Sequence, residues 1–233
     1  PTDSETPFDP LLVRWSDQEN AFDWVPSVTN QSGEQRLSIG SQIVTAINTR
    51  QEILVLTDAA IYSMQYLGPP YVYGFQLLQD NISVMGPKSA ITINNITYWM
   101  GHKKFFTYNG TVESLPCSLR QYVFNDFNYS QEAQVYAGSV GEFNEIWWFY
   151  CSTGSTVIDS YVVYNYLDRV WYYGTLNRTA WLDSGIRQNP MGAFINGVDN
   201  QLTLNPTGSI VYHELGNDDQ SAATPVPIVS YVT

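Results

Sequence analysis

Basic residues are scarce in this sequence of 233 residues. It has only ten Lys and Arg against 22 Asp and Glu, which gives a formal net charge of −12. The ten cations are spread from Arg14 to Arg187, and their only adjacent pair is Lys103–Lys104. Tight nucleic-acid binding needs a stripe of cations along the phosphates, so this composition argues against it. An acidic surface repels DNA instead.

Cysteine and histidine are also nearly absent. The two cysteines are Cys117 and Cys151, and the two histidines are His102 and His213. These residues are too few and too scattered for a metal site or a disulfide framework, so we expect neither metal nor cofactor. We expect both cysteines to be small core hydrophobes, while the sequence leaves open one disulfide between them.

Long apolar runs and targeting segments are lacking too. No run of about 18 apolar residues is present, so no transmembrane helix is expected. A positively charged start followed by an apolar stretch is missing, so we expect no signal peptide. The sequence starts at Pro1 and finishes in the strand-like residues 228–233. Both ends look cut, and we expect a processed chain or one segment of a longer protein.

Motifs for catalysis are missing with one exception. The sequence lacks a Gly-x-Ser-x-Gly elbow, a glycine-rich phosphate loop and the spacing of a calcium loop. The exception is a pair of carboxylates, Asp17 and Asp23, between Trp15 and Trp24. Paired carboxylates can cleave glycosidic bonds and aromatic rings can hold a sugar, so these four residues form a candidate glycan or partner contact. The alternative is a polar loop between two anchoring tryptophans. The Ser-x-Asp-x-Gly-x-x-Trp box of sialidases lacks its Gly here, and we expect no enzyme.

Aromatic residues, by contrast, are abundant. They make up 15% of a chain that is 44% hydrophobic and 14% charged, which suits one sizeable core and argues against disorder. One pattern recurs four times: a strand, a tight link, a strongly apolar strand, a polar turn and an aromatic strand. The apolar second strands begin at Ile53, Ile96, Ile146 and Leu202. This spacing is close to that of propeller blades, roughly 40–50 residues.

The repeat predicts an all-β chain, a β-propeller of four-stranded blades with at least four blade repeats. Its second strands are continuously apolar, as expected where neighbouring blades cover both faces. A β-sandwich with hairpins of similar length is the alternative. The predicted strands are 43–47, 53–56 and 61–66; 90–93, 96–100 and 105–108; 134–138, 145–150, 161–166 and 170–173; and 193–197, 201–204 and 210–213.

One helix is predicted, as a short insertion at residues 118–127 between the second and third blades. Ser118 is its expected N-cap, with Leu119, Tyr122, Val123 and Phe127 on one face. Residues 1–216 are assigned to propeller blades. Residues 217–233 are assigned to a polar linker and the start of a further strand.

An ordered series of phrases spans about residues 11–215. It resembles the propeller region of tail tube, or nozzle, proteins of short-tailed bacteriophages, to which the packaged-DNA stabilisation proteins are related. The series carries the resemblance as a whole, and no single phrase is diagnostic. The phrases are Arg14-Trp15-Ser16-Asp17, Thr49-Arg50-Gln51-Glu52-Ile53, Ile61-Tyr62-Ser63-Met64-Gln65-Tyr66, Gly68-Pro69-Pro70, Asn144-Glu145-Ile146-Trp147-Trp148 and Tyr164-Asn165-Tyr166.

This resemblance implies a structural protein of the virion tail, assembled in the host cytoplasm. Such proteins form a hexameric ring below the portal that retains and then conducts the genome and supports fibres. The implied partners are further copies of the chain, portal or adaptor proteins and tail fibre proteins, with transient passage of DNA. One alternative is a carbohydrate-binding or glycan-cleaving propeller of a tail adhesin that uses Trp15, Trp24, Trp147 or Trp148 to hold the sugar. Another is a cellular propeller scaffold.

Overall fold

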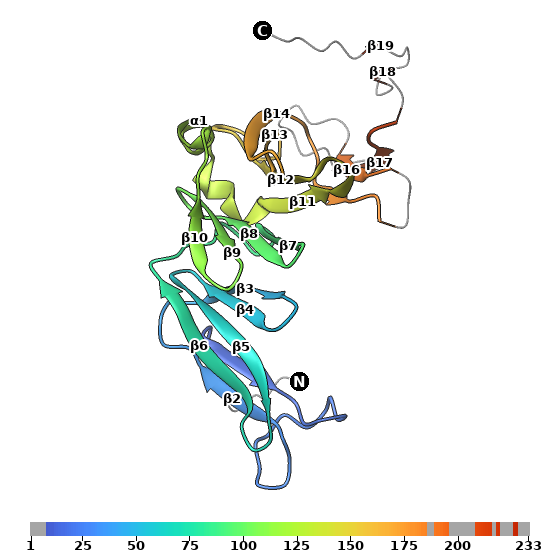
Figure 1. The fold of residues 1–233 in the computed structure, drawn as a ribbon. Helices are drawn as coiled ribbons and strands as arrows, with labels where there is room; N and C mark the ends of the chain where they lie inside the picture. Colours follow the sequence, from blue (N-terminus) through green and yellow to red (C-terminus); the bar gives the residue numbers. More distant parts are fainter. Residues whose placement is uncertain (1–7, 186–188, 196–207, 216–217, 220–225, 228–233) are drawn as a thin grey trace.

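Four-stranded antiparallel sheets follow one another along the chain (Figure 1). The computed structural model describes residues 8–185, 189–195, 208–215, 218–219 and 226–227. The architecture is all-β, as predicted, with propeller-like blades. Blade 1 comprises β3 (Ile43–Asn48), β4 (Ile53–Thr57), β5 (Ala60–Gly68) and β6 (Val72–Asp80). Blade 2 comprises β7 (Ala90–Ile93), β8 (Ile96–Met100), β9 (Phe105–Tyr108) and β10 (Val112–Leu115). Blade 3 comprises β11 (Tyr136–Val140), β12 (Glu145–Tyr150), β13 (Ser160–Asn165) and β14 (Val170–Thr175).

Smaller sheets flank these three blades. Before blade 1, β1 (Leu12–Trp15) pairs with β2 (Gly33–Arg36). After blade 3, a three-stranded sheet forms blade 4 from β15 (Ala180–Leu182), β16 (Met191–Ile195) and β17 (Gly208–Tyr212). In the predicted linker, β18 (Asp218–Asp219) pairs with β19 (Val226–Pro227), while residues 228–233 of the expected further strand lie outside the described residues.

Tight turns set each strand beside the next in the meander. Between β7 and β8, Asn94 and Asn95 adopt φ angles of 50° and 67°. This left-handed region is one that asparagine tolerates better than other side chains, and it matches the twist of a two-residue hairpin. The predicted Asn109-Gly110 turn lies between β9 and β10, with Gly110 at φ 105°. Short links of this kind keep consecutive strands adjacent within one blade.

Both faces of the second strands β4, β8 and β12 are buried, which explains the continuous apolar runs in the sequence. In β12, Trp148 packs in a cluster with blade 2, whereas its neighbour Phe149 packs in a different cluster that includes Trp181 of blade 4. Likewise in β4, Leu54 faces blade 2 and Val55 faces the opposite side. Successive strand residues point to opposite faces, so a strand between two neighbours needs apolar residues at every position.

The first strands of consecutive blades lie against one another. Contacts join β3 to β7, β7 to β11, and β11 to β15. The outermost strands β6, β10 and β14 lie on the convex side of the resulting arc in Figure 1. The described residues therefore form an arc of blades whose first strands are innermost.

Blade 4 corrects the prediction for the fourth repeat. β16 pairs with β15 on one side and directly with β17 on the other. The second strand of this blade therefore begins at Met191 rather than Leu202, and its first strand is β15. The sequence pattern missed β15 because it is only three residues long. The predicted strand 201–204 lies outside the described residues.

The predicted insertion between blades 2 and 3 contains a helix shorter than expected. α1 runs from Arg120–Asn125, its N-cap is Leu119 rather than Ser118, and no side chain caps it. Val123 is fully buried, as predicted, but Tyr122 is exposed and lies against Tyr173 with ring centroids 4.2 Å apart. Two 3₁₀ helices follow, at Tyr129–Gln134 and Gly141–Phe143.

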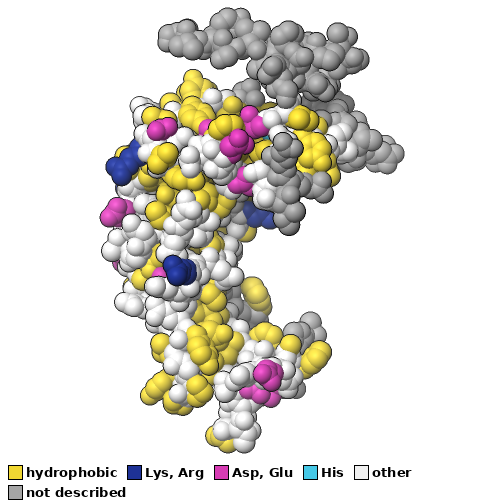
Figure 2. Space-filling model, turned by 45° about the vertical axis from the view of Figure 1, so that its right-hand side comes forward, with side chains coloured by type: hydrophobic (Ala, Val, Ile, Leu, Met, Phe, Trp, Pro, Cys, Tyr) yellow, Lys and Arg dark blue, Asp and Glu magenta, His cyan; other side chains and the backbone are white. Residues whose placement is uncertain are grey.

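Few cations appear on the face of the molecule that Figure 2 draws. On the face drawn in Figure 2, Asp and Glu outnumber Lys and Arg and hydrophobic side chains form scattered patches. Within the part of the chain that the structure describes, no helix is both long enough and apolar enough to span a membrane.

Candidate functional site

The predicted glycan-contact residues lie in and beside the loop that joins β1 to β2. Asp17 and Asp23 come together through the Asp17 amide, which donates to the Asp23 carbonyl (2.8 Å). The Asp17 carboxylate accepts from the Gln31 amide (2.6 Å), and the Asp23 carboxylate accepts from Asn30 Nδ2 (2.9 Å). Both carboxylates thus stabilise the loop itself.

The two tryptophans of this loop have different surroundings. Trp15 Nε1 donates to the Gln31 carbonyl (2.9 Å), and its ring centroid lies 5.3 Å from that of Tyr73 in β6. Trp24 Nε1 donates to the Ala21 carbonyl (2.7 Å) within the loop. Trp15 therefore anchors the loop to blade 1. These contacts describe an anchored polar loop, and glycan binding by it stays a prediction.

A basic groove lies on the outer side of the arc, between β10, α1 and β14. Its first hollow has a volume of about 570 Å³, and a second of about 570 Å³ shares Cys117 and Ser118 with it. Lys103, Arg120 and Arg169 line the groove, beside Trp171. Sequence reasoning missed it because these cations come from three separate segments. The adjacent pair Lys103–Lys104 was its only sequence signal.

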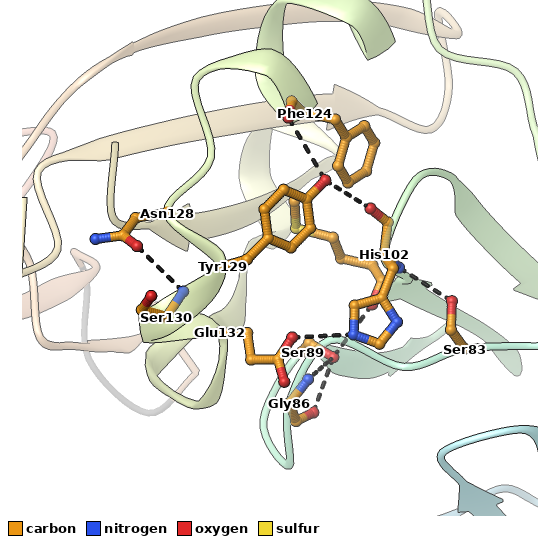
Figure 3. A network of polar contacts seen from close by, with 10 residues as sticks. Ser83, Gly86, Ser89, His102, Phe124, Asn128, Tyr129, Ser130 and Glu132 are labelled. Carbon is orange, nitrogen blue, oxygen red and sulfur yellow. Dashed lines mark hydrogen bonds and ion pairs between the residues drawn. The ribbon is translucent and has the colours of Figure 1, made fainter. Parts of the chain in front are cut away.

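A polar network holds one wall of the basic groove in place (Figure 3). His102 Nε2 lies 2.9 Å from Glu132 Oε2, and the His102 amide donates to Ser83 Oγ (3.0 Å). The hydroxyl of Tyr129, which lines the groove, donates to the His102 carbonyl (2.9 Å). Burial, and then the nearby Glu132 charge, raise the pKa of Tyr129, so its hydroxyl stays protonated and can donate. The network joins the insertion to the β8–β9 turn of blade 2.

The groove has the chemistry of a binding surface. Burial raises the pKa of the Cys117 thiol to about 11, so it is protonated at neutral pH and a poor nucleophile. Cys117 and Cys151 are both free, so the disulfide left open by the sequence is not formed. Among the described residues, no group of three or more His, Cys, Asp or Glu could hold a metal ion. Because three cations line the groove, the ligand that suits it is an acidic or anionic partner.

Polar side chains elsewhere join one blade to the next. Glu52, in the β3–β4 turn of blade 1, accepts hydrogen bonds from Ser63 and from Tyr108 of blade 2. Burial alone would raise the pKa of Glu52, but hydrogen bonds from Ser63, Tyr108 and Gln65 lower it on balance. The carboxylate is therefore charged at neutral pH and forms a charge-assisted contact between blades.

The later blades have joints of the same kind. Trp148 Nε1 of blade 3 donates to the Ser89 carbonyl next to blade 2 (2.9 Å). Trp181 Nε1 of blade 4 donates to the Ser139 carbonyl of blade 3 (2.9 Å), and the Asp183 carboxylate accepts from Ser139 Oγ (2.8 Å). The buried Trp148 and the partly buried Trp181 thus each supply apolar area and one directed hydrogen bond to their joint.

Comparison with known proteins gives the chain no family. No protein-family model matches it, and no curated protein is significantly similar.

Proposed function

We propose that this chain is a structural protein of a bacteriophage tail. It forms part of the ring-shaped nozzle, or tail tube, below the portal, in a hexamer that retains the genome and then conducts it. The ring also supports tail fibres. Portal or adaptor proteins and fibre proteins are its partners, and DNA passes without tight binding.

One observation carries this proposal: many polar side chains of the described residues join blades. Glu52, Trp148, Trp181 and Asp183 each hydrogen-bond across a blade boundary. Asp17 and Asp23, the candidate catalytic pair, stabilise their own loop. Polar groups used in this way suit a rigid module that bears load. The assignment to a tail rests on the resemblance of the ordered series of sequence phrases to tail tube proteins.

The distribution of charge supports the same role. The innermost strands β3, β7, β11 and β15 contain no Lys, Arg, Asp or Glu. The three cations of the basic groove lie away from these strands, Lys103 in the β8–β9 turn, Arg120 in α1 and Arg169 in the β13–β14 turn, where they suit a contact with a neighbouring acidic copy of the ring. A conduit for DNA should not grip the polyanion, and a chain with net charge −12 meets that condition.

The experiment is to look for the chain in purified phage particles by mass spectrometry and to locate it by electron cryomicroscopy. We expect a sixfold ring below the portal, and particles without the protein should lose their packaged DNA. Arg120→Glu in the basic groove should weaken the ring, whereas Arg50→Glu, an exposed cation on the β3–β4 turn, is the matched control. Absence from the particle, or glycan binding by the purified chain that Asp17→Asn abolishes, would overturn the proposal.

A further inference from the structure

The tip of the β1–β2 loop, residues 18–22, presents an apolar ring beside a charge. Every residue of the tip is exposed, and the Phe22 side chain is 95% exposed. Aromatic rings are enriched in protein interfaces relative to the rest of the surface. The Glu19 carboxylate accepts no hydrogen bond and forms no ion pair with another described residue. The tip therefore has two groups that suit a partner, Phe22 and Glu19.

Hydrogen bonds within the loop hold this tip in one shape. The Phe22 amide donates to Asn20 Oδ1 (3.2 Å), and Trp24 Nε1 donates to the Ala21 carbonyl (2.7 Å). At its base, the loop is anchored to blade 1 by the contact of the Trp15 ring with β6. A loop that is ordered before binding loses little conformational entropy when it docks, and this favours a specific contact.

The basic groove offers the complementary groups. Its three cations are exposed, and none of them forms an ion pair with a carboxylate of the described residues. Two partly buried rings, Phe124 and Trp171, line the groove with them. Both rings pack on the buried Phe105, with ring centroids 5.4 and 4.6 Å from it, so the apolar part of the groove is fixed in place.

The segment that carries the loop has the charge opposite to that of the groove. Between Arg14 and Arg36 this segment contains no Lys or Arg. Its carboxylates are those of Asp17, Glu19, Asp23 and Glu34. Complementary charges across an interface speed the encounter of two partners and fix their orientation. The charges therefore favour a contact between this loop and the groove.

The loop cannot reach the groove of its own chain. In Figure 1, β2 lies near the lower end of the arc, whereas α1 lies near the upper end. A contact between loop and groove therefore joins two copies, and it is heterologous because two different surfaces meet. Such a contact repeats from copy to copy and gives a ring when the rotation between copies closes.

We propose that the tip of the β1–β2 loop of one copy docks in the basic groove of the next copy. Phe22 lies against Phe124 and Trp171 of the groove. Glu19 pairs with a cation of the groove, of which Arg120 lines the same hollow as Phe124. This inference rests on the proposed function, because it names the contact that joins the copies of the ring.

The first test reverses the charges of the full chain and measures self-association by sedimentation velocity. We expect Glu19→Arg and Arg120→Glu each to weaken association by at least about tenfold, because like charges then meet. The chain that carries both changes should recover most of the loss, since opposite charges meet again. Glu142→Arg and Arg50→Glu change the net charge equally at exposed positions elsewhere and should have little effect. A chain with both changes that associates as weakly as the single variants would overturn the proposal, as would purified copies that do not associate.

The second test locates the tip in phage particles. A photo-crosslinking p-benzoylphenylalanine replaces Phe22, and mass spectrometry identifies the peptides to which it attaches. We expect dimers linked to the peptides that contain Phe124 or Trp171. A ring in the particle whose crosslinks lie elsewhere would refute the docking and leave the tail function standing. If the chain is absent from particles but the charge rescue succeeds with purified protein, the tail function fails and the docking stands.

Discussion

Trp148 and Phe149 are sequence neighbours that should act on different blade boundaries. Both side chains are fully buried. Trp148 packs with Tyr98, Met100 and Phe105 of blade 2, whereas Phe149 packs in the cluster that includes Trp181 of blade 4. Replacing either by alanine removes a large buried ring, which costs about 3–5 kcal/mol of unfolding free energy.

The Trp148→Ala variant also loses the hydrogen bond to the Ser89 carbonyl. That carbonyl keeps a second donor, the Met100 amide at 3.2 Å, so the loss of the indole bond adds only about 1 kcal/mol. Leu167→Ala is the control: Leu167 is 68% exposed in the β13–β14 turn, and its loss should change stability by less than about 0.5 kcal/mol.

The assay combines urea unfolding with hydrogen exchange on each variant. We expect Trp148→Ala to speed exchange in β8 and β9, and Phe149→Ala to speed it in β15 and β16, with strong destabilisation by both. In a two-layer sandwich, one of two successive residues faces solvent and would be tolerant. If either variant is as stable as the Leu167→Ala control, the reasoning that both faces of β12 are covered by blades is refuted.

Three further predictions concern titratable groups. Glu52→Gln should lower the unfolding free energy by about 1–2 kcal/mol in urea titrations at pH 7, because the Tyr108 hydroxyl loses a charged acceptor. Since the pKa of Glu52 is lowered in the folded chain, this contribution is present above about pH 4.5 and disappears on acidification. An equal difference between variant and parent at pH 3 would contradict the prediction. Burial, with Arg178 beside it, lowers the pKa of His213 to about 4, so the unfolded chain binds a proton below about pH 6.5 that the folded chain does not. Thermal melts should therefore show that stability falls by on the order of 1 kcal/mol between about pH 6.5 and 4, a size reduced because solvent screens this half-buried ring. A flat pH profile that is unchanged by His213→Gln would refute the prediction. The pKa of Cys117 is raised to about 11, so iodoacetamide at pH 8 should label it far more slowly than a free thiol, as followed by mass spectrometry.

The sequence predicted the first three strands of blades 1 to 3 and the fourth strand of blade 3 because their signal is local, whereas β6 and β10 were not predicted. Runs such as Ile53–Thr57 and the Asn109-Gly110 turn report burial on two faces and a tight hairpin without any knowledge of the partner strands. The short β15 has too few residues to show a pattern, so β16, the second strand of the fourth repeat, was predicted as its first strand. The prediction of Ser118 as the N-cap of α1 was wrong because Leu119 directly precedes the helix and no side chain caps it.

The functional features depended on contacts between distant segments. Trp15, Asp17, Asp23 and Trp24 were recognised as a group, but hydrogen bonds with Gln31 and Asn30 decide what the carboxylates do. The basic groove needs Lys103, Arg120 and Arg169 from three segments that only the fold brings together.

The most direct test of the central claim is an electron cryomicroscopy map of the tail at side-chain resolution. The account predicts that this chain lies in the ring below the portal, with β3, β7, β11 and β15 side by side around one propeller axis. A map in which the tail density below the portal does not fit these blades, or in which the blades form two face-to-face layers, would contradict it.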